Sequence, residues 1–258
     1  MTTTTSDLWL RRFHPAPDAA VKLVCLPHAG GSATSFLRLS RELSPTIEVL
    51  AVQYPGRQDR IREPLIGSVA ELAGLLLDVV VERDSRPTAL LGHSMGALVA
   101  FELGLRMQSH GVRPVALFPS GRRAPILHRG PHRDEVQYHL AGDAELLARV
   151  ARLGGTAAHL LADEYIRRAV LPAIRNDFRA AETYRGGDAV LDSPIFAMTG
   201  RTDPEVTLDE VRSWELHSRD AFDMRVFDGS HFFIFDSTTA VAAYASSALG
   251  SLATTDAA

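Results

Sequence analysis

The stretch Leu90–Gly96, which reads LLGHSMG, decides the fold class of this chain. It contains the pattern Gly-x-Ser-x-Gly and lies where an apolar run, Thr88–Leu91, meets the helical pattern of Ala97–Ser109. A serine hydroxyl becomes a useful nucleophile when a sharp strand-to-helix turn lifts it clear of a sheet and a histidine takes its proton. Glycines at positions 92 and 96 suit that turn, because a Cβ there would crowd the backbone. We therefore predict a nucleophile at Ser94; the alternative is a glycine-rich turn with an ordinary serine.

Outward from this turn, short apolar runs alternate with helical patterns. The runs are typical of strands buried on both faces. They are Val21–Leu26, Ile47–Val52, Thr88–Leu91, Val115–Phe118, Ile195–Met198 and Met224–Phe227. The helical patterns are Ser35–Leu43, Val69–Val81, Ala97–Ser109, Leu208–Trp214 and Thr238–Leu249. This alternation predicts an α/β fold with a mostly parallel central sheet flanked by helices. Such sheets bind ligands at the carboxyl ends of their strands.

One segment, residues 131–185, breaks the alternation because it has helical patterns and no strand signal. Asp143–Leu153 reads as a helix with one apolar face, and Asp163–Tyr184 reads as a second helix that Pro172 should kink or split. Long insertions in compact domains usually serve function. We therefore expect residues 1–258 to form a single domain with 131–185 as a helical lid; the alternative is a longer crossover packed on the sheet edge.

Composition and charge exclude several classes of protein. Hydrophobic residues make up 46% and charged residues 22% of the 258 residues, which is ordinary for a globular chain. The net charge of −4 gives no electrostatic case for a nucleic-acid partner. No apolar run approaches the roughly 20 residues that a membrane helix needs. The threonine-rich start lacks the features of a signal peptide. From the net charge and the lack of a long apolar run, we expect neither nucleic acid nor membrane as a partner.

Cys25 is the only cysteine, which excludes an intrachain disulfide and favours a reducing, cytoplasmic location. It lies inside an apolar strand pattern, where a buried structural thiol is expected. The histidines show no metal-ligand spacing, and neither the P-loop nor the dinucleotide-binding pattern is present. We therefore expect no metal and no cofactor.

The base and the acid that Ser94 needs are expected downstream of it, because α/β-hydrolases order their triad as serine, acid, histidine. His231 follows the last predicted strand, where a loop can bring an imidazole over the nucleophile. Asp203 follows the preceding strand, where a carboxylate can accept the Nδ1 hydrogen and fix the tautomer. Asp228 and Asp236 are rivals by sequence proximity, although Asp228 suits the turn before the histidine. Asp203 could also be an ordinary turn or helix-cap residue.

Acyl transfer further needs N–H donors aimed at the developing oxyanion. Leu26–Gly31 (LPHAGG) follows a strand and resembles the glycine-rich loop that supplies one backbone N–H, which we assign to Ala29. The second donor is expected at Met95, the residue after the nucleophile. His28 and His93 are interpreted as packing or hydrogen-bonding groups of their own turns, because the nucleophile has only one base.

Four segments together carry a family resemblance: Leu26–Gly31 (LPHAGG), Tyr54–Arg57 (YPGR), Gly92–Gly96 (GHSMG) and Ser120–Pro125 (SGRRAP). The later segments Gly200–Pro204 and Gly229–Phe233, with Trp214 between them, agree. The chain resembles the type II thioesterases, discrete α/β-hydrolases that accompany modular polyketide synthases and nonribosomal peptide synthetases. The resemblance spans about residues 13–249. Phe118–Pro119 departs from the usual residues at that place but touches no predicted catalytic group.

The resemblance implies hydrolysis of acyl groups from the phosphopantetheine arm of acyl or peptidyl carrier proteins, which clears stalled or wrongly primed chains. It also implies the triad Ser94, Asp203 and His231, on a chain expected to act as a monomer. The runner-up function is that of a small-molecule carboxylester hydrolase, since fold does not fix substrate. A binding module that kept the fold, and acyl transfer to an acceptor other than water, are the remaining alternatives.

A group of basic residues has two interpretations. Arg57, Arg60, Arg62, Arg122 and Arg123 either meet an acidic carrier domain or form ordinary solvated surface. We favour solvated surface, because arginines are most often exposed and unpaired or weakly paired.

Overall fold

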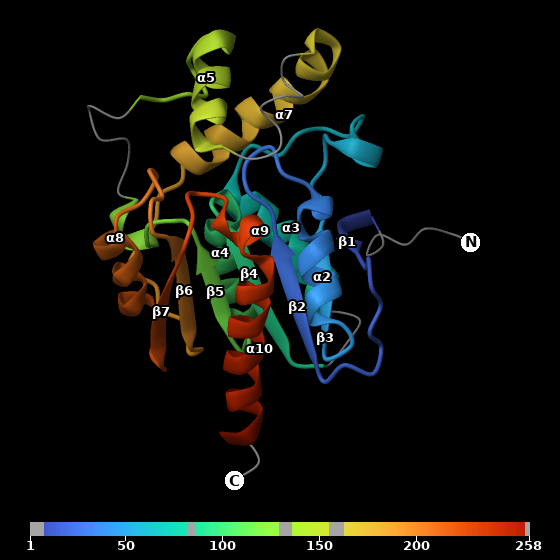
Figure 1. The fold of residues 1–258 in the computed structure, drawn as a ribbon, viewed down its shortest axis with the longest axis vertical. Helices are drawn as coiled ribbons and strands as arrows, with labels where there is room; N and C mark the ends of the chain where they lie inside the picture. Colours follow the sequence, from blue (N-terminus) through green and yellow to red (C-terminus); the bar gives the residue numbers. More distant parts are fainter. Residues whose placement is uncertain (1–7, 82–85, 129–135, 155–162, 256–258) are drawn as a thin grey trace.

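A seven-stranded sheet forms the centre of the molecule, in the order β1-β3-β2-β4-β5-β6-β7 (Figure 1). The computed structural model describes residues 8–81, 86–128, 136–154 and 163–255. The strands are β1 (Leu10–Arg11), β2 (Val21–Leu26), β3 (Ile47–Val52), β4 (Thr88–His93), β5 (Leu117–Ser120), β6 (Ile195–Gly200) and β7 (Phe222–Phe227). All neighbouring pairs are parallel except β1 with β3, which is antiparallel. The parallel α/β architecture predicted from the alternation is confirmed.

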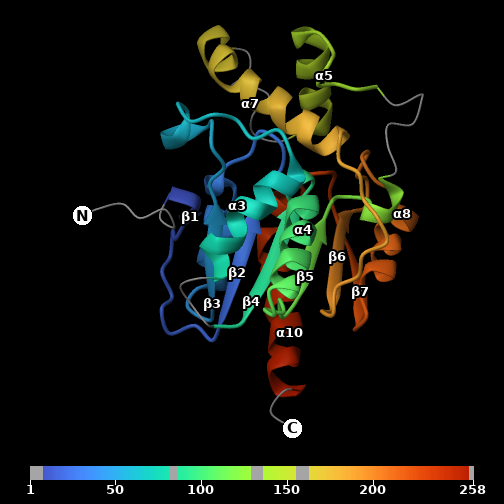
Figure 2. The ribbon, with the colours of Figure 1, turned by 180° about the vertical axis from the view of Figure 1, so that it is seen from behind.

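Helices cover both faces of this sheet. They are α2 (Leu37–Leu43), α3 (Val69–Val81), α4 (Met95–Ser109), α5 (Asp143–Leu153), α7 (Glu164–Glu182), α8 (Leu208–Arg212), α9 (Phe233–Asp236) and α10 (Thr238–Thr255). Short 3-10 turns are η1 (Ala33–Phe36), η2 (Gln58–Arg60), η3 (Pro125–Leu127) and η4 (Ser213–His217). Helices α2 and α10 lie on one face (Figure 1), and α3 and α4 lie on the other (Figure 2).

Alternation of side chains along the strands feeds two separate cores. Leu23 and Leu91 are fully buried on the α2 and α10 side, whereas Val24 and Leu90 are fully buried on the α3 and α4 side. Successive side chains of a strand point to opposite faces, so adjacent positions fill different layers. Burial on both faces explains why the strands read as continuous apolar runs.

The strand register aligns the ends from which functional loops emerge. Leu26 at the end of β2 lies opposite Gly92 of β4, and His93 lies opposite Ser120 of β5. Gly200 at the end of β6 lies opposite Phe227 of β7. Because all these strands run in one direction, the loops that follow them meet at one edge of the sheet.

The boundaries of several elements differ from those predicted. The predicted ranges of β2, β3, α3 and α5 agree with the structure, while β5 starts two residues later than the predicted Val115 and includes Pro119 and Ser120. Strand β4 continues through His93, which carries it directly into the serine turn. The sequence missed β1, because a strand of two residues has no detectable periodicity.

Helices α5 and α7 lie beyond the carboxyl-end edge of the sheet, at the top of Figure 1. A small apolar cluster of Leu146, Leu171 and Ile174 joins them. The predicted split at Pro172 is wrong, since α7 runs unbroken from Glu164 to Glu182. Pro172 is exposed, and the buried face of the helix keeps its packing despite the lost backbone bond. Of the expected lid, residues 131–135 and 155–162 lie outside the described residues.

Within the described residues, no helix combines the length and the apolar character needed to cross a bilayer.

Candidate active site

The turn between β4 and α4 holds Ser94 in a conformation that few side chains adopt. Its φ of 54° and ψ of −116° place it at the N-cap of α4, outside the common regions for L-residues. A Cβ on Gly92 would lie 2.1 Å from the carbonyl oxygen of Gly96, and a Cβ on Gly96 would lie 2.1 Å from that of Leu26. Both glycines are therefore required by close backbone approach, as the Gly-x-Ser-x-Gly pattern predicted. The strained turn exposes the serine hydroxyl above the sheet.

His231 and Asp203 lie together at the ends of neighbouring strands. His231 Nδ1 is 3.0 Å from each carboxylate oxygen of Asp203, and both side chains are almost fully buried. The backbone N–H of Glu205 also donates to Asp203 Oδ1 at 2.9 Å. This second donor fixes the carboxylate orientation, so the imidazole is held with Nδ1 toward the acid and Nε2 free to face the serine.

The predicted rivals for the acid lie elsewhere. Asp228 is exposed and pairs with Arg201 across the turn, at 3.1 Å. Asp236 is exposed at the end of α9, on the wall of the cavity described below. Within the described part of the chain, neither carboxylate hydrogen-bonds to His231, whereas both oxygens of Asp203 do.

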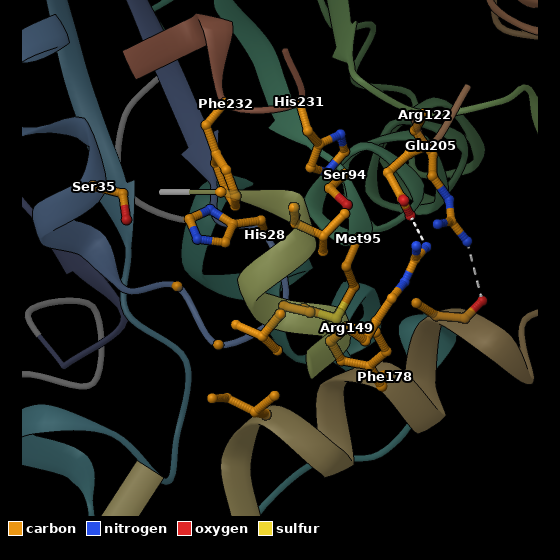
Figure 3. A pocket seen from close by; sticks show the side chains of 18 of the residues that line it. His28, Ser35, Ser94, Met95, Arg122, Arg149, Phe178, Glu205, His231 and Phe232 are labelled. Carbon is orange, nitrogen blue, oxygen red and sulfur yellow. Dashed lines mark hydrogen bonds and ion pairs between the residues drawn. The ribbon is translucent and has the colours of Figure 1, made fainter. Parts of the chain in front are cut away.

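Ser94 and His231 face the same cavity, whose volume is about 1130 Å³. Figure 3 shows the two side chains next to each other on its wall. Ala29 and Met95, the two residues expected to offer backbone N–H groups, also line it. Met95 is the first residue of α4, where the N–H has no partner inside the helix. The structure thus brings the five predicted site residues together: four of them line the cavity, and the fifth, Asp203, hydrogen-bonds to His231.

Two further histidines form a cluster with His231, the predicted base. The ring of His93 lies 4.9 Å from that of His231 and 5.7 Å from that of His28 between centroids. Burial lowers the pKa of His28 to about 3, and burial followed by the neighbouring His231 lowers the pKa of His93 well below its usual value. Both rings therefore stay neutral at physiological pH. His93 Nδ1 is 3.1 Å from the Ser120 hydroxyl, which agrees with the predicted packing role.

Gly121 is a site residue whose role sequence reasoning missed. A Cβ there would lie 2.9 Å from His93 Cε1 and 3.3 Å from both Asp203 Oδ2 and His231 Cε1. Its φ of 59° is also one that side chains rarely adopt. The glycine leaves room for the acid–base pair, and its place in the SGRRAP segment was the available signal.

The far side of the cavity is formed by the helical cover, which we define as α5 and α7. Ile174 and Phe178 of α7 contribute apolar surface, and Arg149 of α5 contributes a charge. Arg149 pairs with Glu205, two residues after Asp203 (Figure 3). The cover is thus connected to the loop that carries the acid, and the cavity has both apolar and charged walls.

The five arginines do not form a common solvated surface. Arg62 is exposed as predicted, but Arg57 and Arg60 are buried, which corrects the prediction for those two. Arg60 stacks on the ring of Trp9 and pairs with Glu63, while Arg57 pairs with Asp177 of α7. Arg122 and Arg123 are partly buried beside the cavity, which they line. Asp177 and Trp9 lie far in sequence from the arginines that they contact, and no local pattern reveals them, whereas Glu63 lies only three residues from Arg60.

Among the described side chains, no group of three histidine, cysteine or acidic residues could hold a metal ion. The reacting groups that the structure assembles are a hydroxyl, an imidazole, a carboxylate and backbone N–H groups. Together they suit nucleophilic acyl chemistry at a carbonyl carbon.

Comparisons with known proteins find related sequences over most of the chain. A family model described as a thioesterase domain matches residues 21–248. The thioesterase PikA5 of Streptomyces venezuelae is 48% identical over 235 residues, which are 90% of this chain and 82% of the relative.

Solved structures extend the likeness to three dimensions. The type II thioesterase BorB from the borrelidin biosynthetic cluster superimposes with a TM-score of 0.86 at 44% identity, covering 95% of this chain and 99% of its own. YbtT, a type II thioesterase from the yersiniabactin NRPS/PKS pathway, gives a TM-score of 0.83 at 28% identity, with 95% and 99% covered. These likenesses confirm the α/β-hydrolase fold expected from the sequence.

Proposed function

The chain belongs to the thioesterase family, and from this premise we propose that Ser94, His231 and Asp203 hydrolyse acyl thioesters carried on the phosphopantetheine arm of carrier proteins. The observation that carries the proposal is the acid–base pair of Asp203 and His231, at 3.0 Å, beside a serine in a strained turn on a cavity wall. The relatives from polyketide and mixed peptide–polyketide clusters support a carrier-bound substrate.

The first half of the reaction forms an acyl-enzyme. His231 Nε2 takes the Ser94 proton while Oγ attacks the thioester carbonyl carbon. The carbonyl oxygen becomes an oxyanion, to which the N–H groups of Ala29 and Met95 donate. The C–S bond then breaks, and the imidazolium gives its proton to the departing thiolate. Asp203 stabilises the imidazolium throughout and does not itself take the proton.

The second half releases the acyl group. A water donates its proton to His231 as its oxygen attacks the ester carbonyl, and the collapse returns the proton to Ser94 Oγ. Because His28 and His93 stay neutral, His231 is the one histidine of the three that becomes charged during both halves. We propose that no metal or cofactor takes part, since Ser94, His231 and a water account for every proton transfer and the amides stabilise the oxyanion.

The helical cover is proposed to act as the lid of this cavity and to limit the acyl chain that it accepts. Its apolar residues Ile174 and Phe178 lie on the cavity wall. A substrate on a flexible arm needs an open channel from the surface to Ser94, and a lid can shape that channel. The proposal includes a monomeric protein in a reducing cytoplasm, where the buried Cys25 thiol, whose pKa burial raises, stays inert.

The test compares release of short acyl groups from a phosphopantetheinylated carrier protein with hydrolysis of the matched p-nitrophenyl ester. We expect faster turnover of the carrier thioester, and its loss in Ser94→Ala. Turnover of the ester without carrier activity would contradict the proposal and favour a general carboxylester hydrolase.

A further inference from the structure

A buried carboxylate on the cover contacts the loop that carries the oxyanion donor. Asp177 lies on α7, far in sequence from the serine turn, and its side chain is 1% exposed. Its Oδ2 accepts the backbone N–H of Gly30 at 2.8 Å. Gly30 directly follows Ala29, the donor proposed above. No feature of the triad requires a carboxylate at this place.

Arg57 of the YPGR segment completes the contact. It donates to both oxygens of Asp177, with Nη1 at 2.6 Å from Oδ2 and Nη2 at 3.0 Å from Oδ1. Its Nη1 also donates to the carbonyl of Gly31 at 3.2 Å. A bidentate pair of this kind fixes geometry as well as charge. The arginine and the carboxylate therefore hold the two glycines that follow Ala29.

Two hydrogen bonds, one within the loop and one to Asp177, fix the peptide units on either side of Ala29 and so the direction of its N–H. The carbonyl of His28 accepts the N–H of Gly31 at 2.9 Å, which fixes the peptide unit between His28 and Ala29. In a planar trans peptide the N–H points opposite the carbonyl, so the Ala29 N–H is directed away from Gly31. The next peptide unit is fixed by the Gly30 N–H on Asp177. Both peptide units that flank Ala29 are thus held.

The helix also fits closely against the loop. A Cβ on Gly30 would lie 2.8 Å from Cγ1 of Ile174, one turn before Asp177 on the same helix, and the φ of Gly30 is 76°. The loop therefore has little room to shift while α7 stays in place. Ile174 lines the cavity, so the same helix face contacts both the cavity and the oxyanion loop.

We infer that Asp177 is a positioning residue, which sets the oxyanion donor of Ala29 and makes its alignment depend on the seating of α7. The inference rests on the proposed function, since it concerns the transition state of acyl transfer. It predicts that the cover contributes to the chemical step as well as to acyl selection. Its signature is a loss of affinity for a tetrahedral oxyanion without a loss of affinity for an uncharged chain.

The experiment compares two probes in Asp177→Ala. An alkyl trifluoromethyl ketone forms a hemiketal when Ser94 Oγ adds to its carbonyl and the proton passes to His231, which leaves an oxyanion. S-butyl pantetheine is a thioether that lacks the reactive thioester carbonyl, so it reports ground-state binding alone. We expect the ketone inhibition constant to rise and kcat for acyl-pantetheine to fall by the same factor, about 10- to 100-fold. Removing an oxyanion donor altogether lowers kcat by about 10²–10³-fold, and a misdirected donor should cause only part of that loss. KM and thioether affinity should stay within about twofold, since neither binds through an oxyanion.

Two companion variants separate positioning from folding. Asn176→Ala removes the bond from Asn176 Nδ2 to the carbonyl of Ile66, at 2.8 Å, which is a contact of α7 outside the oxyanion loop, and it keeps the Asp177 contacts that seat the helix on that loop. It should leave ketone affinity unchanged. Asp177→Asn keeps an oxygen for the Gly30 N–H but leaves the Arg57 charge unpaired, so it should lower Tm while retaining most ketone affinity.

The inference is overturned if ketone and thioether affinities fall together in Asp177→Ala, if neither changes, or if Asn176→Ala has the same effect. An equal loss of ketone affinity in Asp177→Asn and Asp177→Ala would overturn the claim that Asp177 acts through its hydrogen bond with the Gly30 N–H. Failure of the proposed function would give different results. The wild type would not hydrolyse acyl-pantetheine, or Ser94→Ala would retain that activity.

Discussion

The strand-end loops and the helical cover face each other across one cavity, and they are held in different ways. In the loops, main-chain geometry fixes the site: glycine positions exclude any Cβ, and Asp203 and His231 are almost fully buried. In the cover, a small apolar cluster and partly exposed ion pairs such as Arg149 with Glu205 hold the helices. The rigid half carries the proposed reacting groups, and we propose that the softer half adjusts to the acyl chain.

The difference predicts where substitutions change rate and where they change selectivity. Elements held by few buried contacts open at lower free-energy cost than the core of a sheet. Asp177 is the exception in the cover, because it is buried and bound to both Arg57 and Gly30. The experiments below test this division, beginning with the largest expected effect.

Ser94→Ala should abolish thioester hydrolysis, with kcat/KM falling by about 10⁴–10⁶-fold, because no other group forms the acyl-enzyme. Steady-state turnover of an acyl-pantetheine thioester measures the loss. Ser109→Ala, at the other end of α4, is the matched serine control. Near-normal activity in Ser94→Ala would show that Ser94 is not the nucleophile and that the strand-end loops do not carry the reacting groups.

Asp203→Asn should lower kcat by about 10³–10⁴-fold while KM changes little, because the imidazole loses the partner that fixes its tautomer. Asp228→Asn is the control, since that carboxylate is exposed and pairs only with Arg201 among the recorded contacts. A larger loss in Asp228→Asn than in Asp203→Asn would mean that the acid is wrongly assigned.

Phe178→Ala should change selectivity rather than chemistry. It widens the cavity from the cover side, so kcat/KM for longer acyl chains should rise by about tenfold relative to short ones. A series of acyl-pantetheines of increasing length gives the ratio. Tyr165→Ala, 84% exposed on the same helix, should leave the ratio unchanged. An equal loss for every chain length in Phe178→Ala would contradict a role of the cover in selection.

His128→Asn should flatten the acid dependence of stability. Burial lowers the pKa of His128 to about 2, whereas an unfolded histidine titrates near 6.5. As the pH falls from about 6.5 toward 2 the unfolded chain takes up a proton that the folded chain does not, so stability falls by up to about 1.4 kcal/mol per pH unit. Above pH 6.5 neither state holds this proton and the contribution is constant.

Urea unfolding between pH 6 and pH 4 measures that slope. The wild type should lose more unfolding free energy over this range than His128→Asn, and His110→Asn at an exposed position is the control. Identical slopes for wild type and His128→Asn would show that burial of this imidazole does not control acid stability.

The triad could be predicted because each of its residues follows a strand directly. Ser94 carries a pattern with a specific backbone requirement, and the strands before Asp203 and His231 read as buried runs. Parallel strands bring such positions to one edge without further information. Sequence and fold rules alone therefore sufficed to predict that His231 pairs with Asp203 and not with Asp228 or Asp236.

Residues of the cover and its contacts were much harder to predict. Asp177 lies in the middle of a helix and resembles any helical carboxylate until Arg57 and Gly30 are brought to it. Arg57 and Arg60 were expected in solvent because nothing local signals Asp177 or Trp9, the distant residues that they contact. Strand β1 was missed because it is only two residues long. Pro172 was expected to kink or split its helix, and the split does not occur because tertiary packing keeps the helix continuous.

The central claim is that acyl groups pass through Ser94, and trapping the intermediate tests it most directly. The enzyme is mixed with an acyl-pantetheine thioester, quenched in acid within milliseconds, and digested for mass mapping of the acyl adduct. The account predicts a single acyl ester on the peptide that contains Ser94, absent in Ser94→Ala and longer-lived in His231→Ala wherever that variant still acylates. Turnover with the acyl group on another residue, or an unchanged adduct in Ser94→Ala, would contradict it.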